Sequence, residues 1–150
     1  MIPPYDPETG CLPPGLHDAR WPEVLARYGF NEHRLLLLAG LKGALDSLRL
    51  AGCARVYLDG SFITSKLLPN DFDGCWEMRG VDFDALDAHE PVLLNWSKRR
   101  AAQKARFRGE LFLAESAADP CGTPYIEFLQ HDRSSGRAKG IVVINLGDLP

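Results

Sequence analysis

Leucine side chains recur at three- and four-residue steps between residues 31 and 52, which is the period of a helix that buries one face. The repeating positions are Leu35, Leu38, Leu41, Leu45 and Leu48. Asn31 precedes them as an N-cap, and Gly52 follows at the position where a left-handed residue ends many helices. The pattern predicts a long amphipathic helix packed on a sheet.

Shorter apolar and alternating runs surround this helix. They predict strands at residues 54–60, 70–78, 109–116, 124–132 and 140–146. They predict helices at 21–30 and 96–107, and one helical turn or short helix at 81–87. The order of these elements favours an α/β or α+β fold, with a mixed β-sheet and helices packed on one face.

The N-terminal segment differs in composition from the rest of the chain. Residues 1–22 contain six of the eleven prolines, and proline disfavours regular helices and central strands. We therefore expect an extended, irregular arm at 1–22 that wraps around a single domain at 23–150. A chain of 150 residues is the usual size of one domain.

Composition excludes several classes of protein. The chain is 45% apolar and 25% charged, as is usual for globular proteins. No run of 18 apolar residues is present, so no membrane interaction through a spanning helix is expected. The N-terminus lacks a basic region followed by an apolar one, and the four cysteines form no CxxC pair. These features favour a cytoplasmic protein with reduced cysteines.

The segment 97–108 is strongly basic. It carries six Lys and Arg residues and no acidic one, although the whole chain has a net charge of −3. Such a segment is a candidate surface for an anion or a partner. The alternative is a solvated face of a helix with no partner.

Asp71 and Asp73 are the first candidates for a chemical role. On a strand both side chains project from the same face, roughly 7 Å apart along the chain, while Phe72 points the other way. Two carboxylates held this close repel each other unless a cation lies between them. Oxygen ligands of this kind suit Mg²⁺, which prefers to complete its shell with water and substrate phosphates.

Gly60 and Ser61 form the second half of the candidate site. They follow the apolar run of 54–59 at an expected strand-to-helix turn. Gly60 lets the backbone approach a ligand closely, and the hydroxyl and amide of Ser61 at a helix N-terminus favour a phosphate. Lys66 follows and is a candidate to neutralise the outer phosphates of a nucleotide.

The Gly60-Ser61 pair, the nine-residue gap and the Asp71-x-Asp73 pair together resemble the signature of the nucleotidyltransferase superfamily. This superfamily includes polymerase β-like enzymes and small bacterial minimal nucleotidyltransferases. The chain also resembles a family of small bacterial proteins of unassigned function with a Pro-rich start, "VYLDGSF" and a closing "KGIVVI". The first resemblance implies a nucleotidyltransferase-like mixed sheet.

The resemblance also implies an activity. An NMP would be transferred from an NTP to a hydroxyl of a macromolecular acceptor, a protein or a tRNA, with two Mg²⁺ ions. Small members of the superfamily often act in toxin–antitoxin or defence modules. The alternative is a catalytically inactive scaffold that serves as an antitoxin-like interaction module.

The resemblance calls for a third acidic ligand from a later strand. Glu110 opens the strand after the basic helix, where the superfamily places this residue. Glu115, five residues on, would point to the opposite face of a regular strand. Glu127 lies in the run 124–132 between two apolar residues. Glu110 is the preferred candidate for metal ligand and base, and Glu127 and Glu115 remain open.

Overall fold

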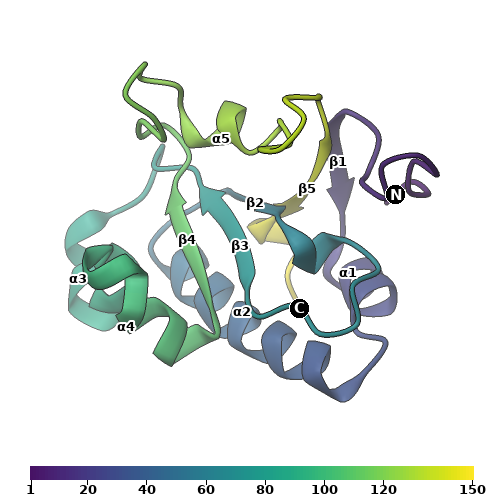
Figure 1. Ribbon diagram of the computed structural model, residues 1–150. Coiled ribbons are helices and arrows are strands. Elements are labelled where there is room, and N and C mark those ends of the chain that lie inside the picture. The colour runs from purple at the N-terminus through teal and green to yellow at the C-terminus, as the bar shows by residue number, and fades with distance from the viewer.

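The computed structural model describes residues 1–150, and a five-stranded mixed sheet forms its centre (Figure 1). The strands are β1 (Gly15–Ala19), β2 (Arg55–Asp59), β3 (Phe72–Trp76), β4 (Gly109–Leu113) and β5 (Gly140–Asn145). Their spatial order is β1-β5-β2-β3-β4. Strand β2 is antiparallel to both β5 and β3, whereas β4 is parallel to β3 and β1 is parallel to β5. The predicted α/β (α+β) class with a mixed sheet is confirmed.

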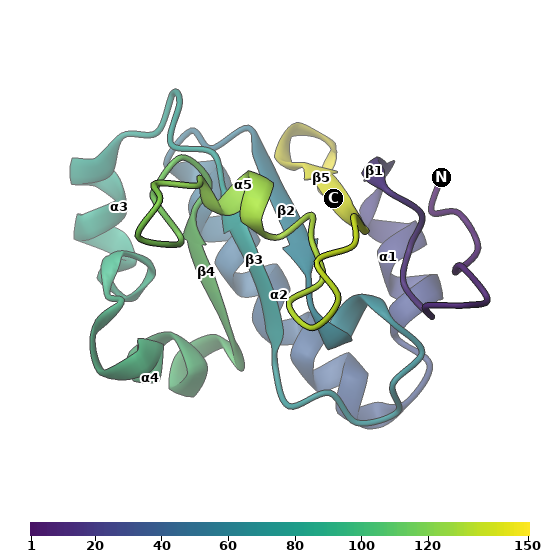
Figure 2. The same cartoon turned by 45° about the horizontal axis from the view of Figure 1, so that its top comes forward.

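Four helices bury their apolar side chains on one face of this sheet, and a fifth, single-turn helix lies over the other face (Figure 2). The helices are α1 (Trp21–Tyr28), α2 (Glu32–Leu50), α3 (Phe83–His89), α4 (Ser97–Phe107) and α5 (Tyr125–Phe128). The core on the first face contains 28 buried residues and the core on the second face only six. The second face is therefore left largely open for a site. No helix is long and apolar enough to cross a membrane.

Helix α2 forms as its leucine pattern predicts. The side chain of Asn31 caps it by accepting a hydrogen bond from the Arg34 amide at 2.8 Å. Gly52 has φ of +94° just beyond the end of the helix, as expected of a glycine in this place. The expectation is wrong for Leu35, which is 47% exposed, because its side chain lies outside the stripe that meets the sheet. The buried stripe consists of Leu37, Leu38, Leu41, Ala44, Leu45 and Leu48.

The expectation of an irregular arm at 1–22 is wrong over Gly15–Ala19. This stretch forms β1 and pairs in register with β5, from Gly15 opposite Gly140 to Ala19 opposite Ile144. Ile2 and Leu12, farther toward the N-terminus, are buried in the larger core. The proline-rich segment therefore takes part in both the sheet and the core.

The expected strand at 124–132 is also wrong. Tyr125–Phe128 forms one helical turn, and the chain then reaches β5 through a loop in which only His131 and Ala138 form an isolated bridge. The aromatic side chains of this turn pack over the second face, on Leu129 and its neighbours. The segment covers the sheet from above and does not extend it, and a pattern of apolar residues alone does not distinguish these two cases.

Helix α4 forms close to its predicted position but begins irregularly. Lys98, Arg99 and Arg100 all have positive φ values, between 50° and 60°. Left-handed backbone costs roughly 1–2 kcal/mol per residue in residues with a Cβ. Regular helix follows from this turn to Phe107, which is buried in the larger core.

Candidate functional site

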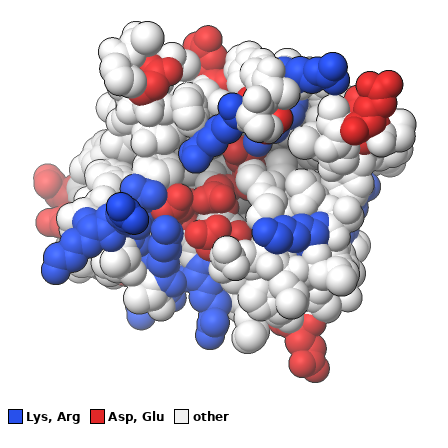
Figure 3. Space-filling view, in the orientation of Figure 1, with Lys and Arg blue, Asp and Glu red and all other residues white.

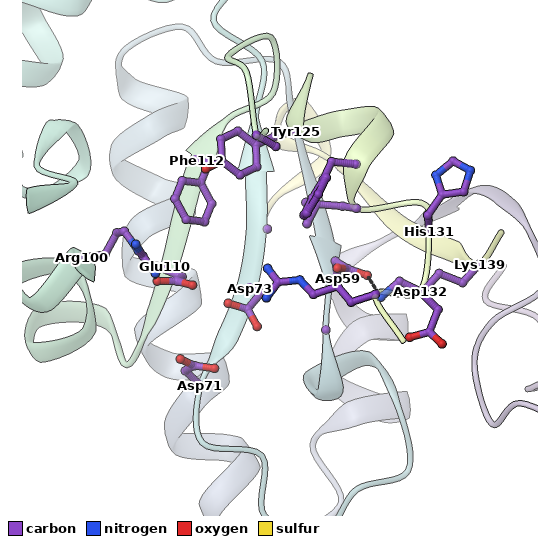
Figure 4. Close-up of a pocket in the computed structure, with 16 residues that line it drawn as sticks. Asp59, Asp71, Asp73, Arg100, Glu110, Phe112, Tyr125, His131, Asp132 and Lys139 are labelled. Atoms are coloured by element: carbon purple, nitrogen blue, oxygen red, sulfur yellow. Dashed lines mark hydrogen bonds and ion pairs between the residues drawn. The ribbon is translucent and has the colours of Figure 1, made fainter. Parts of the chain in front are cut away.

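Three acidic side chains stand side by side on the open face of the sheet. Asp59 of β2 is paired with Asp73 of β3, and Asp73 is paired with Glu110 of β4. Asp71 precedes Asp73 by two residues and projects from the same face, as strand alternation requires (Figure 4). The intervening Phe72 is fully buried on the opposite face. We call the four acidic residues Asp59, Asp71, Asp73 and Glu110 the carboxylate row.

The carboxylate row lines a cavity of about 510 Å³. Its other lining residues include an aromatic and apolar group and a basic group, besides Gly60, Gly74 and Asp132. The first group is Phe112, Ala118, Tyr125, Phe128 and Leu129, and the second is Arg100, His131, Arg133 and Lys139. Acidic side chains gather at the centre of the open face, and the Lys and Arg side chains lie around them (Figure 3). The cavity thus combines an acidic floor with aromatic and cationic side chains.

Gly60 stands directly against the carboxylate row. Its backbone, at φ of 80° and ψ of −166°, lies in a region that only glycine occupies readily. A Cβ at this position would lie 2.7 Å from Oδ2 of Asp73. Residue 74 must be glycine for a different reason, because a Cβ there would lie 2.2 Å from the carbonyl oxygen of Tyr57. Both glycines keep β2, β3 and the following turn close together.

The loop between Ser61 and Asp71 is held by the N-terminal part of α2. The Arg34 guanidinium is completely buried and donates hydrogen bonds to five backbone carbonyls, those of Tyr28, Ser61, Phe62, Thr64 and Lys66. Asn31 Nδ2 donates to the Leu67 carbonyl at 2.7 Å, and His33 Nε2 lies 2.6 Å from the Pro69 carbonyl oxygen. These contacts hold the loop that links β2 to β3 against the start of α2.

The expected α-helix after Ser61 is absent, and a single 3-10 turn, Ser61–Ile63, takes its place. A helix N-terminus therefore does not favour a phosphate here. Ser61 lines a neighbouring hollow of about 190 Å³ that also contains Asp59, Gly60 and Lys139. Lys66 lies on an exposed loop outside the larger cavity, although its charge offsets a small part of the rise in the pKa of Asp71.

Two members of the carboxylate row have cationic partners within the chain. Arg100 Nε donates to Glu110 Oε2 at 2.7 Å, and Lys104 Nζ lies 3.6 Å from the same oxygen. Lys139 Nζ lies 2.9 Å from Asp59 Oδ1. Asp71 and Asp73, by contrast, form no ion pair. The Asp-x-Asp pair is thus the part of the row without a cationic partner.

The electrostatics of the carboxylate row follow from this pairing. Burial, followed by the negative charges of Asp71 and Glu110, raises the pKa of Asp73 to about 8. Burial and the charge of Glu110 also raise the pKa of Asp71. Burial would raise the pKa of Glu110, but the hydrogen bonds from Arg100 and Asp73 and the charges of Arg100 and Lys104 together outweigh it and hold this pKa below its usual value. Asp73 has no ion pair to offset its burial and the charges of its neighbours, so its neutral form is favoured.

The donor set fits a hard cation such as Mg²⁺. All four side chains of the row are carboxylates, which are the oxygen donors that Mg²⁺ prefers. No three acidic, His or Cys side chains converge closely enough to hold an ion as they stand. Ion binding therefore requires side chains of the row to turn toward each other.

Glu110 is the one candidate for the third acidic ligand that lies in the carboxylate row. Glu115 lies beyond the end of β4, where its carboxylate accepts a hydrogen bond from the Met78 amide at 3.2 Å. Glu127 is exposed on α5 and does not line the cavity. The second Asp-x-Asp pair of the chain has a local role, because Asp82 caps α3 through a 3.0 Å bond from the Ala85 amide.

Sequence reasoning missed Asp59 and the aromatic wall. Asp59 ends an otherwise apolar strand and directly precedes Gly60, so a polar residue at the end of this strand was the available signal. The rings of Phe112 and Tyr125 are stacked, with centroids 4.3 Å apart and planes at 7°. Phe112 is two residues after Glu110 on the same face, which alternation predicts, but nothing local predicts that Tyr125 lies over it.

The fold and site define a mixed α/β protein with a carboxylate-lined cleft at one face of its sheet. Within that class, the chain belongs to a family described as a family of unknown function (DUF6932), whose sequence model matches residues 3–145. Comparisons with curated proteins and with solved structures found no match. The nucleotidyltransferase resemblance therefore remains a prediction.

Proposed function

We propose that this protein is a Mg²⁺-dependent nucleotidyltransferase that moves an NMP from an NTP to a hydroxyl of a macromolecular acceptor. The observation that supports this most is the carboxylate row. Asp71, Asp73 and Glu110 stand together on one sheet face, beside the Gly60 turn, at the floor of an open cavity. This is the arrangement that the resemblance implies for such an enzyme.

Each side chain has a role in this proposal. Asp71 and Asp73 would hold Mg²⁺, with Glu110 as third ligand, and the bound metal would stabilise the charge on the leaving pyrophosphate. Gly60 lets the phosphates come close to the row, since no Cβ stands in the way. Lys139, which lines both the large cavity and the hollow beside Ser61, is placed to meet the outer phosphates.

The chemical step is a substitution at the α-phosphorus. The acceptor oxygen forms a bond to this phosphorus, while the bond from the same phosphorus to the oxygen of the departing pyrophosphate breaks. Glu110 accepts the proton of the acceptor hydroxyl. This carboxylate is ionised at neutral pH, as a base must be.

A transfer assay tests this proposal. The purified protein is incubated with Mg²⁺, a cell lysate and each of four α-labelled NTPs, and labelled products are separated by size. Asp73→Asn replaces a carboxyl that already favours its neutral form, so the fold should persist. Asp84→Asn is the matched control, because Asp84 is the exposed second member of the other Asp-x-Asp pair. Label with wild type and Asp84→Asn, and none with Asp73→Asn, is the expected result.

A non-catalytic interaction module is the second candidate. Its support is that Arg100, Lys104 and Lys139 already neutralise two of the four carboxylates. In this case no labelled product would form with any NTP, although circular dichroism shows folded protein. Label that is equally strong with Asp73→Asn would contradict the transferase.

A further inference from the structure

Lys139 is the cation that pairs with Asp59, and this pair lies at one end of the carboxylate row (Figure 4). Lys139 Nζ lies 2.9 Å from Asp59 Oδ1, and the two side chains are largely buried, with exposed fractions of 19% and 8%. Asp59 is paired across the sheet with Asp73, one of the two proposed metal ligands. The protein therefore holds one of its own cations beside the place proposed for Mg²⁺.

The contact between these two side chains is an ion pair without the alignment of a hydrogen bond. Oδ1 of Asp59 is buried and has no hydrogen-bond partner, although the Lys139 ammonium lies 2.9 Å away. Hydrogen bonds to charged groups are strong when their geometry is good, and a buried acceptor without one is costly. Asp59 is thus compensated by charge alone, so a ligand that offers more to either side chain can separate the pair.

Lys139 has space to leave Asp59. Its side chain lines three hollows, which are the 510 Å³ cavity, the 190 Å³ hollow beside Ser61 and a third hollow of about 300 Å³ beside Arg137. Its backbone is held in place, because its amide donates to the Gln130 carbonyl at 2.8 Å and β5 begins directly after it. The flexible four-carbon stem alone needs to turn for the ammonium to reach another partner.

We infer that Lys139 makes ion binding at the carboxylate row depend on the nucleotide. Without a nucleotide, Lys139 is paired with Asp59, and its charge opposes a divalent cation at the row. The phosphates of a nucleotide draw the ammonium away, which leaves the Asp59 carboxylate free to attract the cation. The inference rests on the proposed function, because it describes the regulation of that same metal–nucleotide site.

The inference predicts opposite effects on the two ligands, since one ammonium cannot serve Asp59 and the phosphates at once. Loss of the Lys139 ammonium should favour the cation and disfavour the nucleotide, and loss of the Asp59 charge should do the reverse. A pair that only anchors the chain before β5 behaves differently. Its removal would lower stability and would shift the binding of both ligands in the same direction or of neither.

Mn²⁺ binding without nucleotide is the first measurement, followed at pH 8 through the electron paramagnetic resonance signal of the free ion. Lys139→Met should bind Mn²⁺ about tenfold more tightly than wild type, and Asp59→Asn about tenfold more weakly, because a nearby unit charge is removed in each case. Arg137→Met is the matched control. Arg137 is an exposed cation of the same loop that forms no ion pair, so its replacement should leave Mn²⁺ binding unchanged.

Nucleotide binding in EDTA is the second measurement, followed through the fluorescence anisotropy of an NTP that carries a fluorescent group on its ribose. Lys139→Met should bind this probe about tenfold more weakly, because the phosphates lose a cation. Asp59→Asn should bind it about tenfold more tightly, because the ammonium no longer has a competing partner. Arg137→Met should again match wild type.

Circular dichroism and the unfolding temperature establish that each variant is folded. Lys139→Met leaves the Asp59 carboxylate buried without a counter-charge, which destabilises many proteins. Asp59→Asn combined with Lys139→Met removes both charges, so it tests the same exchange in a fold without an unpaired buried charge. This double variant should bind Mn²⁺ within about threefold of wild type and should still bind the nucleotide about tenfold more weakly.

Opposite shifts of the two single variants in the two assays support the inference. Where wild type binds both ligands, unchanged binding by Lys139→Met, or weaker binding of both ligands by it, overturns the inference and leaves the transferase intact. No nucleotide binding by folded wild type, together with no Mn²⁺ binding by any of the proteins, contradicts the metal–nucleotide site itself, and the inference falls with it.

Discussion

The backbone of Gly60 lies in close contact with the carboxylate of Asp73. The positive φ is accessible to glycine, and a Cβ would stand 2.7 Å from the Asp73 carboxylate. Gly60→Ala should therefore destabilise the fold and displace Asp73. We expect the free energy of unfolding in urea to fall by at least about 1 kcal/mol more than for Gly136→Ala.

Gly136 is the matched control for this comparison. It also has a positive φ, of 71°, but an added Cβ would have no atom within 4 Å. Both variants carry the cost of a left-handed alanine, and only Gly60→Ala adds the contact with Asp73. Equal losses would show that the close approach has no energetic consequence.

The raised pKa of Asp73 makes stability depend on pH. Folded Asp73 holds its proton up to about pH 8, whereas the unfolded chain releases it near 3.9. Between these values the folded state binds more protons, so metal-free stability should fall as pH rises, by up to about 1.4 kcal/mol per unit. Glu110, whose pKa is lowered, acts in the opposite direction only at more acidic pH.

Urea unfolding in EDTA at pH 5, 6.5 and 8 measures this dependence. Asp73→Asn cannot ionise, so its stability relative to wild type should increase over the series. A constant difference between the two proteins would contradict a raised pKa of Asp73.

For single residues, the sequence predicts which face of the sheet a side chain projects from when this follows from alternation along one strand. Asp71 and Asp73 project together for this reason, and Phe72 anchors the strand from behind. Asp59 could not be assigned in the same way, because its approach to Asp73 depends on the register between β2 and β3. That register is in turn fixed by Gly74, which allows the close contact with the Tyr57 carbonyl.

Among the elements, the loop between β2 and β3 depends on one buried guanidinium. Arg34→Leu removes its hydrogen bonds to all five carbonyls and leaves the buried carbonyls of Tyr28 and Phe62 without this donor, so we expect a loss of roughly 3–5 kcal/mol in unfolding free energy. Hydrogen exchange of the amides at 61–67 should accelerate at the same time. Arg34→Lys should recover only part of the loss, because a single ammonium cannot replace the planar fork.

Arg49→Leu provides the control on the same helix. Arg49 makes one carbonyl contact, from Nη1 to the Leu149 oxygen at 2.9 Å. Its replacement should cost about 1 kcal/mol and leave exchange at 61–67 unchanged. Similar losses for the two arginines would mean that Arg34 does not organise the loop.

Elements with a strong internal period were predictable, and elements made by distant contacts were not. Helix α2 has a leucine stripe and a cap of its own. Strand β1 lies between prolines and becomes a strand only through its pairing with β5, more than 120 residues later in the chain. The single turn of α5 has a strand-like sequence and folds back because its aromatic residues cover the second face.

For the molecule as a whole, the N-terminal segment is expected to contribute to stability. Leu12 is 2% exposed within the larger core, whereas Leu16 on β1 is 49% exposed. Leu12→Ala should lower the unfolding free energy by about 2–4 kcal/mol, and Leu16→Ala by less than about 1 kcal/mol. Thermal unfolding measures both. Small, equal effects would indicate that residues 1–22 are a detachable arm, as their composition alone predicts.

The arrangement of the whole molecule explains why the open face is available. Four helices cover one side of the sheet, and only α5 and its adjoining loops rest on the other. Strand alternation predicted the Asp-x-Asp pair, and the resemblance to nucleotidyltransferases predicted Glu110. The cavity around these residues could not be predicted from the sequence. Its walls come from Phe112, Tyr125, Arg133 and Lys139, which tertiary contacts bring together.

The most direct test of the carboxylate row is the binding of Mn²⁺ together with an NTP whose α,β-bridge is a methylene group, measured by the loss of the free-ion electron paramagnetic resonance signal. We predict that wild type and Asp84→Asn bind the ion in the presence of the analogue, and that Asp73→Asn binds it at least tenfold more weakly. Equal binding by all three proteins, or no binding by folded wild type, would contradict a metal–nucleotide site at Asp71, Asp73 and Glu110.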